Sequence, residues 1–168
     1  KITPEPVQAG VSRFFANLSM PVTVVNQALQ GRPGDAARSL GRFAVNTTVG
    51  VVGVFDPASH FGMLSRDDED FGQTLATWGW RDSRYLVLPL LGPRTVRDAL
   101  GIVGDQPLSP IAQIQDSGVA SGLQALEIVD ARTQLLPMDN FRRDALDDYL
   151  LVRDAWIQHR NHQIQQDL

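Results

Sequence analysis

The sequence predicts an all-α fold for a single domain that spans residues 1–168. Apolar residues recur at helical spacing along most of the chain, and no segment shows the apolar and polar alternation of a strand. Residues that favour helix ends flank several of these segments. A chain of this length can bury a core without disulfides or a structural metal. One helical domain is therefore expected.

Three helices are expected in the first part of the chain. Thr3 and Pro4 are typical of an N-cap and a first helical position, and the helix they open carries on one face Val7, Val11, Phe14, Phe15 and Leu18. A shorter helix is expected from Pro21 to Gln30, with Gly31 as its left-handed stop. Asp35 is expected to cap a third helix, whose inward-facing residues would be Leu40, Phe43, Ala44 and Thr47.

The second part of the chain predicts further helices around one extended connector. Ser65 and Asp68 resemble a capping box before a helix with Phe71, Leu75 and Trp78. The run from Tyr85 to Pro93 has a central proline, which excludes an interior strand and breaks a helix, so an extended apolar connector is expected. Pro93 or Thr95 would open the next helix, and Ser109-Pro110 a longer one to about Val129. Asp139 would cap the last helix, with an apolar stripe of Phe141, Ala145, Leu146, Tyr149, Leu150 and Trp156.

The composition excludes several classes of protein. A net charge of -4 without a clustered basic face argues against nucleic acid as a partner. The absence of cysteine excludes disulfides and thiol catalysis and removes the usual ligands of structural zinc. No apolar run reaches the roughly 18 to 20 residues that a membrane-spanning helix needs. The opening residues KITPEPVQAG also lack the pattern of a signal peptide.

The stretch from Phe43 to Phe55 is uncharged and contains two glycines three residues apart. On its pattern alone it is a core helix followed by a turn. Glycine allows backbones to approach closely, so close packing is expected at Gly50 and Gly53. Small residues also recur on the later long helix, where close helix contacts are expected at Gly118 and Gly122.

Several blocks, taken in order, resemble the MlaA (VacJ) family of outer-membrane lipoproteins. The blocks read FFANL, VNQALQG, GRFAVNTTVGVVGVFDPA, EDFGQTLATWGW, YLVLPLLGP, VRDALG and YLLVRDAWIQHR. The resemblance covers nearly the whole chain. One departure lies after the WG of the fourth block, where the family commonly has a glycine before the tyrosine and this chain reads RDSRY.

The resemblance implies a ring of amphipathic helices in the periplasmic leaflet of the outer membrane, around an amphipathic channel. It implies a non-enzymatic protein without cofactor or metal, which removes misplaced phospholipids from the outer leaflet. The implied partners are trimeric porins, the bilayer and a soluble periplasmic lipid carrier of the MlaC type. Family proteins begin with a signal peptide, a lipobox cysteine and further helical sequence, so the lipid anchor and the first helices are expected to be absent from residues 1–168.

The resemblance also suggests roles for particular residues. A lipid path that is apolar with a few polar groups is expected along Phe43, Asn46, Thr47, Thr48, Val51 and Phe55. A lipid-facing belt is expected to leave exposed Phe43, Val51, Val52, Phe55 and parts of Tyr85–Leu91, with Trp78 and Trp80 at its edge. Other residues in or beside the family blocks are expected to hold the ring: Asp56, Phe71, Gln73, Thr74, Trp78, Pro89, Gly92, Pro93, Arg97, Asp98 and Arg132.

Two other functions remain open from the residues alone. A membrane-associated phospholipid hydrolase would need a positioned base or a metal, for which the candidates are His60, His159 and His162. The chain has no GxSxG or HExxH motif, and a solvated pair is the favoured reading of the two later histidines. A scaffold whose apolar faces bind a porin or a partner helix is the other alternative.

Overall fold

The computed structural model describes residues 3–63, 68–89, 91–136 and 147–166. Its helices are α1 (Glu5–Leu29), α2 (Pro33–Thr48), α3 (Pro57–His60), α4 (Phe71–Thr77), α5 (Val96–Asp105), α6 (Ser117–Leu135) and α8 (Asp148–Gln166). Two short strands, β1 (Tyr85–Leu88) and β2 (Gly92–Thr95), form an antiparallel hairpin. The helical fold class predicted from the sequence is confirmed, with this hairpin as an addition.

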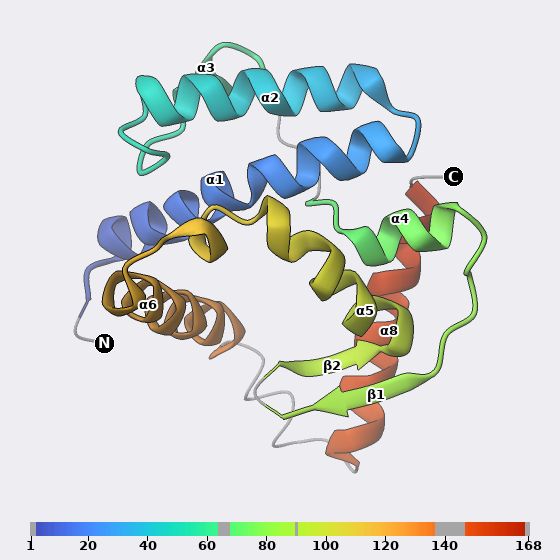
Figure 1. Ribbon diagram of the computed structural model, residues 1–168. Coiled ribbons are helices and arrows are strands. Elements are labelled where there is room, and N and C mark those ends of the chain that lie inside the picture. Colours follow the sequence, from blue (N-terminus) through green and yellow to red (C-terminus); the bar gives the residue numbers. More distant parts are fainter. Residues whose placement is uncertain (1–2, 64–67, 90, 137–146, 167–168) are drawn as a thin grey trace.

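Helix α1 lies across the middle of the molecule (Figure 1). It packs along α2, which lies with α3 on one side of it, while α6 and α4 contact it from the other side. Helix α5 packs on α4, and α8 contacts both α4 and strand β2. Within the described residues, no helix combines the length and the apolar character needed to cross a membrane.

The two helices expected before Gly31 form one helix. Helix α1 begins after Pro4, not after Thr3, and continues through Pro21 to Leu29. An internal proline removes one backbone hydrogen bond, and the packing of α1 along α2 compensates for that loss. The predicted stop at Gly31 is confirmed, because Gly31 has a φ of 79°.

Helix α2 buries the face that was expected to be exposed. Its buried residues are Ala36, Ser39, Arg42 and Asn46, whereas Leu40 is 55% exposed and Ala44 is exposed. Phe43 and Thr47 are only half-buried. The inward assignment was wrong because the buried face here carries hydrogen-bonding side chains. Asp35 also lies in the first turn and pairs with Arg32 at 3.0 Å instead of capping the helix.

The connector between α4 and α5 is a hairpin, not an extended segment. Strand β1 pairs with β2 in a register that places Tyr85 opposite Thr95 and Val87 opposite Pro93. Pro89 follows β1, and Pro93 is tolerated because a two-stranded sheet has only edge strands. Helix α5 then starts after Thr95, whose side chain accepts a hydrogen bond from the Asp98 N–H. Of the two predicted starts, Thr95 is therefore confirmed and Pro93 is wrong.

The caps of α4 and α6 differ from the predicted ones. Asp70 caps α4 by accepting from the Gln73 N–H, and the predicted cap Ser65 lies outside the described residues. Short 3-10 turns at Gln106–Leu108 and Ile111–Gln113 replace the start expected at Ser109-Pro110. Helix α6 begins only after Asp116, whose carboxylate accepts from two backbone N–H groups.

The last expected helix corresponds to α8, which begins at Asp148. Its predicted cap Asp139 and the first members of its stripe, Phe141, Ala145 and Leu146, lie outside the described residues. Within α8, Trp156 is half-buried, and Tyr149 and Leu150 are exposed. The expected stripe is therefore not an inward-facing one along the described part of this helix.

Among the described residues, polar side chains dominate the interior, and many large apolar side chains are exposed. Buried polar and charged residues outnumber buried apolar ones, and the largest fully buried side chains are Arg97, Gln27, Gln73, Asn26 and Thr74. The predicted exposure of the belt is confirmed for Val52, Trp78, Trp80, Val87 and Leu91, as well as for Val51 (59% exposed) and Phe55 (60%). Phe43 is half-buried, and Leu90 lies outside the described residues.

A strained turn connects α2 to α3. Val51 and Val52 have φ values of 54° and 58°, a left-handed conformation that costs a β-branched residue roughly 1–2 kcal/mol. The backbone approaches closely on both sides of them. A Cβ at Gly50 would lie 2.5 Å from the carbonyl oxygens of Asn46 and Phe55, and one at Gly53 would lie 2.3 Å from Asn17 Cβ.

The close contacts expected at Gly118 and Gly122 are not found within the described residues. A Cβ at Gly122 would have no neighbour within 4 Å, and one at Gly118 would meet only Asp116 Oδ1, at 3.2 Å. Helix α6 is largely exposed on all sides, so its small residues do not pack against another described helix.

We predict that Gly53→Ala lowers the free energy of unfolding by about 1–3 kcal/mol, because alanine meets both the positive φ and the Asn17 side chain. The matched control is Gly34→Ala in the first turn of α2, where a Cβ has open space. This control should leave stability unchanged or raise it by up to about 1 kcal/mol. Urea unfolding in one membrane mimetic measures both variants, and equal stabilities would contradict the strained-turn account.

Candidate functional site: a polar interior beside an apolar groove

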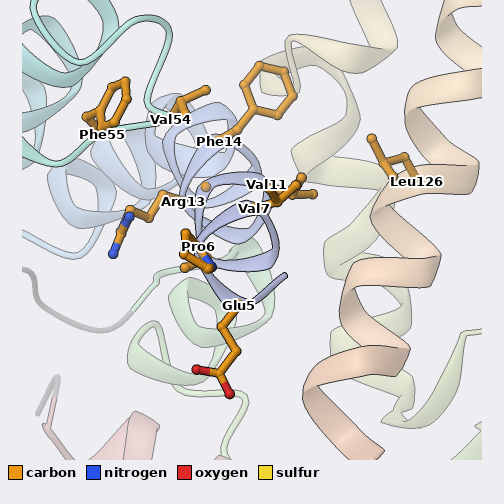
Figure 2. A pocket seen from close by; sticks show the side chains of 11 residues that line it. Glu5, Pro6, Val7, Val11, Arg13, Phe14, Val54, Phe55 and Leu126 are labelled. Carbon is orange, nitrogen blue, oxygen red and sulfur yellow. The ribbon is translucent and has the colours of Figure 1, made fainter. Parts of the chain in front are cut away.

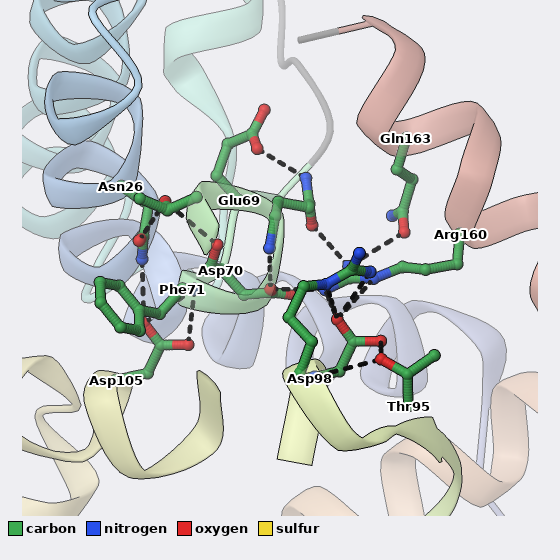
Figure 3. Close-up of polar contacts among 12 residues, drawn as sticks. Asn26, Glu69, Asp70, Phe71, Thr95, Asp98, Asp105, Arg160 and Gln163 are labelled. Carbon is green, nitrogen blue, oxygen red and sulfur yellow. Dashed lines mark hydrogen bonds and ion pairs between the residues drawn. The ribbon is translucent and has the colours of Figure 1, made fainter. Parts of the chain in front are cut away.

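Arg160 of α8 joins three helices through its guanidinium group (Figure 3). Its Nη2 lies 2.8 Å from Asp98 Oδ1 on α5 and 2.6 Å from Asp70 Oδ1 at the start of α4. Its Nη1 donates to Gln73 Oε1 at 2.7 Å. A buried cation is stable only where carboxylates and hydrogen bonds surround it, so this position fixes α8 against α4 and α5.

Asp98 is held from the other side by its own helix and by the hairpin. Arg97 donates to Asp98 Oδ1 and also to the carbonyl oxygens of Trp80 and Arg81, at 3.1 and 3.0 Å. Thr95 donates its hydroxyl proton to Asp98 Oδ2 at 2.7 Å. The start of α5 and the segment before β1 are thereby joined through buried polar groups.

The polar interior extends to α1 through Asn26. Asp105 accepts from Asn26 Nδ2 at 2.9 Å and from the Phe71 N–H at 3.0 Å. Asn26 Oδ1 accepts from the Thr74 hydroxyl at 2.6 Å. These contacts fix α4 between α1 and α5 (Figure 3). We call the buried groups around Arg160, Asp98, Asp105, Asn26 and Thr74 the central network.

A second polar cluster joins α2 to α3. Arg42 Nη2 lies 3.1 and 3.0 Å from the two carboxylate oxygens of Asp56. Asn46 donates to Asp56 Oδ1 at 3.0 Å and accepts from the Ala58 N–H at 3.1 Å. The Ser59 hydroxyl donates to Asp56 Oδ2 at 2.5 Å. This α2–α3 cluster links the residues before the strained turn to those after it.

The surroundings shift the pKa values of the buried groups in different directions. Burial raises the pKa of Asp56, but hydrogen bonds from Ser59, Asn46 and Arg42 outweigh it and lower the value to about 2. Burial likewise raises the pKa of Asp98, but Arg160, Thr95 and Arg97 together outweigh it and lower the pKa below its usual range. For Asp105, burial prevails over its hydrogen bonds from Phe71 and Asn26 and raises the pKa. Both clusters are thus built around charged carboxylates.

An apolar groove lies between the first half of α1, the turn after α2, and α6 (Figure 2). It has a volume of about 790 Å3 and is open to the outside. A second cavity of about 460 Å3 adjoins it, since Arg13 and Phe55 line both. The second cavity is more polar and includes Asp56, Ser59 and His60.

The structure separates the residues that were expected along a lipid path. Asn46 is buried in the α2–α3 cluster, and Thr47 accepts a hydrogen bond from Asn17 at 2.9 Å. Thr48 is exposed and donates to the Ala44 carbonyl at 2.7 Å. Val51 and Phe55 are exposed, and of the whole expected set only Phe55 lines a cavity described above. A lipid path along these residues stays a prediction.

The residues expected to hold the ring fall largely in the two polar clusters and beside the hairpin. Phe71 and Trp78 form an edge-to-face pair with ring centroids 5.9 Å apart. Gln73, Thr74, Arg97 and Asp98 belong to the central network, and Asp56 to the α2–α3 cluster. Pro89, Gly92 and Pro93 lie in or beside the hairpin. Arg132 is in the last turn of α6.

Sequence reasoning missed the residues that organise both clusters. From the sequence, no role was assigned to Arg160, Arg42, Asn26 or Asp105. Two of them nevertheless lie in the family blocks: Arg160 is the last residue of YLLVRDAWIQHR, and Arg42 is the second residue of the block that begins GRFAVNTT. The candidate histidines contact other groups: His60 Nδ1 lies 3.2 Å from the Asp56 carbonyl oxygen, and His162 Nε2 lies 2.8 Å from Gln166 Nε2.

These observations define a helical protein whose described interior is largely polar and whose surface exposes many large apolar side chains. Residues 1–163 match the family described as MlaA lipoprotein. The chain therefore belongs to the MlaA lipoprotein family, which confirms the resemblance seen in its sequence blocks. A solved structure described as "Structural basis for maintenance of bacterial outer membrane lipid asymmetry" has a TM-score of 0.82 and 30% identity, over 97% of this chain and 82% of that one.

Named relatives agree with this assignment. The intermembrane phospholipid transport system lipoprotein MlaA of Shigella flexneri is 33% identical over 94% of this chain, and that of Escherichia coli K12 is 32% identical over the same share. An uncharacterized protein of Rickettsia typhi is 32% identical over 98% of the chain. The chain spans 63% of the length of the two MlaA proteins and 66% of the Rickettsia protein.

Removal of the Arg160 charge should destabilise the fold strongly. Arg160→Met removes the cation beside Asp70 and one of the two cations beside Asp98, and removal of one partner from a buried pair typically costs about 3–5 kcal/mol. Arg153→Met on the same helix is the control, because Arg153 pairs with Asp154 at the surface. Thermal unfolding should show a large loss for the first variant only. Similar unfolding temperatures for both would show that the central network does not hold α8.

The α2–α3 cluster should make stability depend on pH. The pKa of Asp56 in the folded state, about 2, lies below its ordinary value of 3.8. Asp56 therefore stabilises the fold above about pH 4, and this contribution is lost as pH falls through about 2. Asp56→Asn should show a smaller loss of stability than the wild type over that range.

The comparison of unfolding free energies at pH 5, 4, 3 and about 2 isolates Asp56. The stabilising contribution of Asp98 also falls as the pH falls, whereas that of Asp105 rises. Both carboxylates are present in the wild type and in Asp56→Asn, so their effects cancel in the comparison. A variant whose profile runs parallel to that of the wild type throughout would refute the assignment.

Proposed function

We propose that this chain, acting as one domain over residues 1–168, transports phospholipids between membranes and does not cleave them. The observation that carries this proposal is its inverted polarity, with hydrogen-bonded charges inside and large apolar side chains outside. Membership of the MlaA family and the relatives named as phospholipid transport lipoproteins support the same function.

The polarity suits a protein that contacts lipid over much of its surface. A water-soluble helical protein gains stability by burying apolar faces, whereas this chain leaves Leu40, Val51 and Phe55 exposed. In hydrocarbon, exposure of those side chains costs no free energy, and the polar groups are stabilised by hydrogen bonds to one another in the interior. A location at the outer membrane, in its periplasmic leaflet, accounts for both features.

Phospholipid transport sets a demand that this surface fits. The two acyl chains hold about thirty methylenes, and at about 0.8 kcal/mol each their exposure to water would cost on the order of 20 kcal/mol. A transporter therefore shields the chains with apolar surface while it admits a polar headgroup. We propose that the helices form a ring around an amphipathic channel that does so, and that Phe43, Thr47 and Thr48 lie near it.

The finer steps of the proposed function follow the family. Phospholipids misplaced in the outer leaflet would enter the channel and pass to a soluble periplasmic carrier, which maintains lipid asymmetry. Trimeric porins would hold the protein in the bilayer. The exposed apolar residues of α2, α5 and α6, such as Leu40, Val103 and Ile128, offer surface for such membrane partners.

The proposal is tested in cells that lack the gene and are complemented with variants. Deletion should raise the amount of phospholipid exposed at the cell surface, and the wild-type gene should restore it. His60→Ala, His159→Ala and His162→Ala should each restore it nearly fully, because transport needs no catalytic base. Surface-accessible phospholipid is the measurement.

A hydrolase would give a different result. Loss of its base or metal ligand should lower activity by orders of magnitude, and lysolipid or fatty acid should appear with the wild-type protein. Release of either product, together with failure of one stably produced histidine variant, would overturn the transport proposal. Unchanged surface phospholipid after deletion would overturn it as well.

A further inference from the structure

The groove beside α1 has the size and lining of a small-molecule site. Its volume of about 790 Å3 falls within the range of about 300–1,000 Å3 that is usual for ligand pockets. Its lining is dominated by apolar side chains: Pro6, Val7, Val11, Phe14, Val54 and Leu126. Figure 2 shows Leu126 of α6 facing Val7 and Val11 of α1. An alkyl chain is the kind of group that such walls accept.

The strained turn builds one wall of this groove. It brings Val54 onto Gly10 of α1, where a Cβ would lie 3.3 Å from Val54 Cγ1. The positive φ at Gly53 and the close contact with Asn17 hold the chain in that path. The turn therefore holds Val54 and Phe55 over α1 as one wall of the groove.

Among the described residues that line the two cavities, Arg13 is the only arginine or lysine. No described residue forms an ion pair with it. The nearby carboxylate of Asp56 is already bound by Arg42. Glu5 also lines the groove, but Figure 2 shows its carboxylate pointing away from Arg13. Within the part of the chain that the structure describes, Arg13 is thus a charged group without a counterion at the border between an apolar and a polar cavity.

We propose that the groove binds one anionic amphiphile, with its alkyl chain between α1 and α6 and its phosphate at Arg13. Arginine matches phosphate because its guanidinium presents parallel N–H donors to the oxygens. The polar cavity beyond Arg13, lined by Ser59 and His60, accommodates the rest of a headgroup. The proposal rests on the proposed function and makes this groove a side site at which a lipid is held.

The test uses an alkyl phosphate with a photoactivatable diazirine at the end of its tail. The protein is reconstituted in phosphatidylcholine nanodiscs with this probe. The sample is irradiated, the protein is digested, and labelled peptides are measured by mass spectrometry. Label should appear on the segments around Val11 and Leu126. Arg13→Gln should lower the labelling about tenfold, which corresponds to the loss of one charge-assisted hydrogen bond.

Matched variants and probes separate the possible sources of binding. Arg84→Gln removes an exposed arginine outside both cavities and should label like the wild type. Leu126→Gln changes an exposed side chain of the groove and should lower the labelling. A probe with the same tail and a trimethylammonium head should label the groove weakly, and inorganic phosphate should not compete with the alkyl phosphate.

Equal labelling of Arg13→Gln and the wild type would overturn the proposal, as would equal labelling by the cationic probe. Full competition by inorganic phosphate would instead indicate a site for the free anion and would also overturn it. The proposed function is judged separately by surface phospholipid in deletion cells. If the groove is not labelled but deletion raises surface phospholipid and the wild-type gene reverses it, only the proposed side site is refuted.

Discussion

The structure depends on the pairing of its buried charges. Arg160 lies 2.6–2.8 Å from oxygen atoms on α4 and α5, and few apolar side chains are buried beside it among the described residues. An unpaired guanidinium in that position would cost far more than the burial of any one of those side chains returns. Helix α8 therefore has its place because Asp98 and Asp70 are there, and those carboxylates have their positions because Thr95 and Gln73 hold them.

The same constraint explains the outer surface. Because polar side chains pair in the interior, the apolar faces of α2, α5 and α6 lie on the outside, where contact with water would be unfavourable. In the proposed location at the outer membrane, lipid would remove that cost. The strained turn at Val51 and Val52 fits this picture, because two exposed β-branched residues in left-handed conformations are retained only where the surrounding contacts hold them. Here the α2–α3 cluster and Asn17 do so, and the turn forms a wall of the groove.

Predictions from local sequence signals were correct where the physical rule behind them holds in any solvent. Gly31 ends α1 and Thr95 caps α5 because backbone geometry and hydrogen bonding are the same in water and in lipid. The inward face of α2 was wrong because the rule for amphipathic helices assumes water outside, and here Leu40 is exposed while Arg42 is buried. The hairpin was missed because its strands are four residues long, Pro89 follows the first strand and Pro93 lies within the second.

The candidate site was predictable only through the family blocks. They pointed to Gln73, Thr74, Arg97 and Asp98, yet no local pattern shows that Arg160 lies against them, 62 residues beyond Asp98 in the chain. The groove was unpredictable for the same reason, since Val11, Val54 and Leu126 come together only in three dimensions. The positive φ values of two successive valines also have no signal in the sequence, because valine is among the residues least suited to that conformation.

The central claim is that the exposed apolar side chains contact lipid. The chain has no cysteine, so a single nitroxide label can be introduced at Leu40, at Phe55 or at the exposed polar control Gln165. The measurement is the accessibility of each label in liposomes to oxygen, which concentrates in hydrocarbon, and to a water-soluble nickel complex. The account predicts that labels at Leu40 and Phe55 favour oxygen and that the label at Gln165 favours nickel. Equal nickel accessibility at all three positions would contradict it.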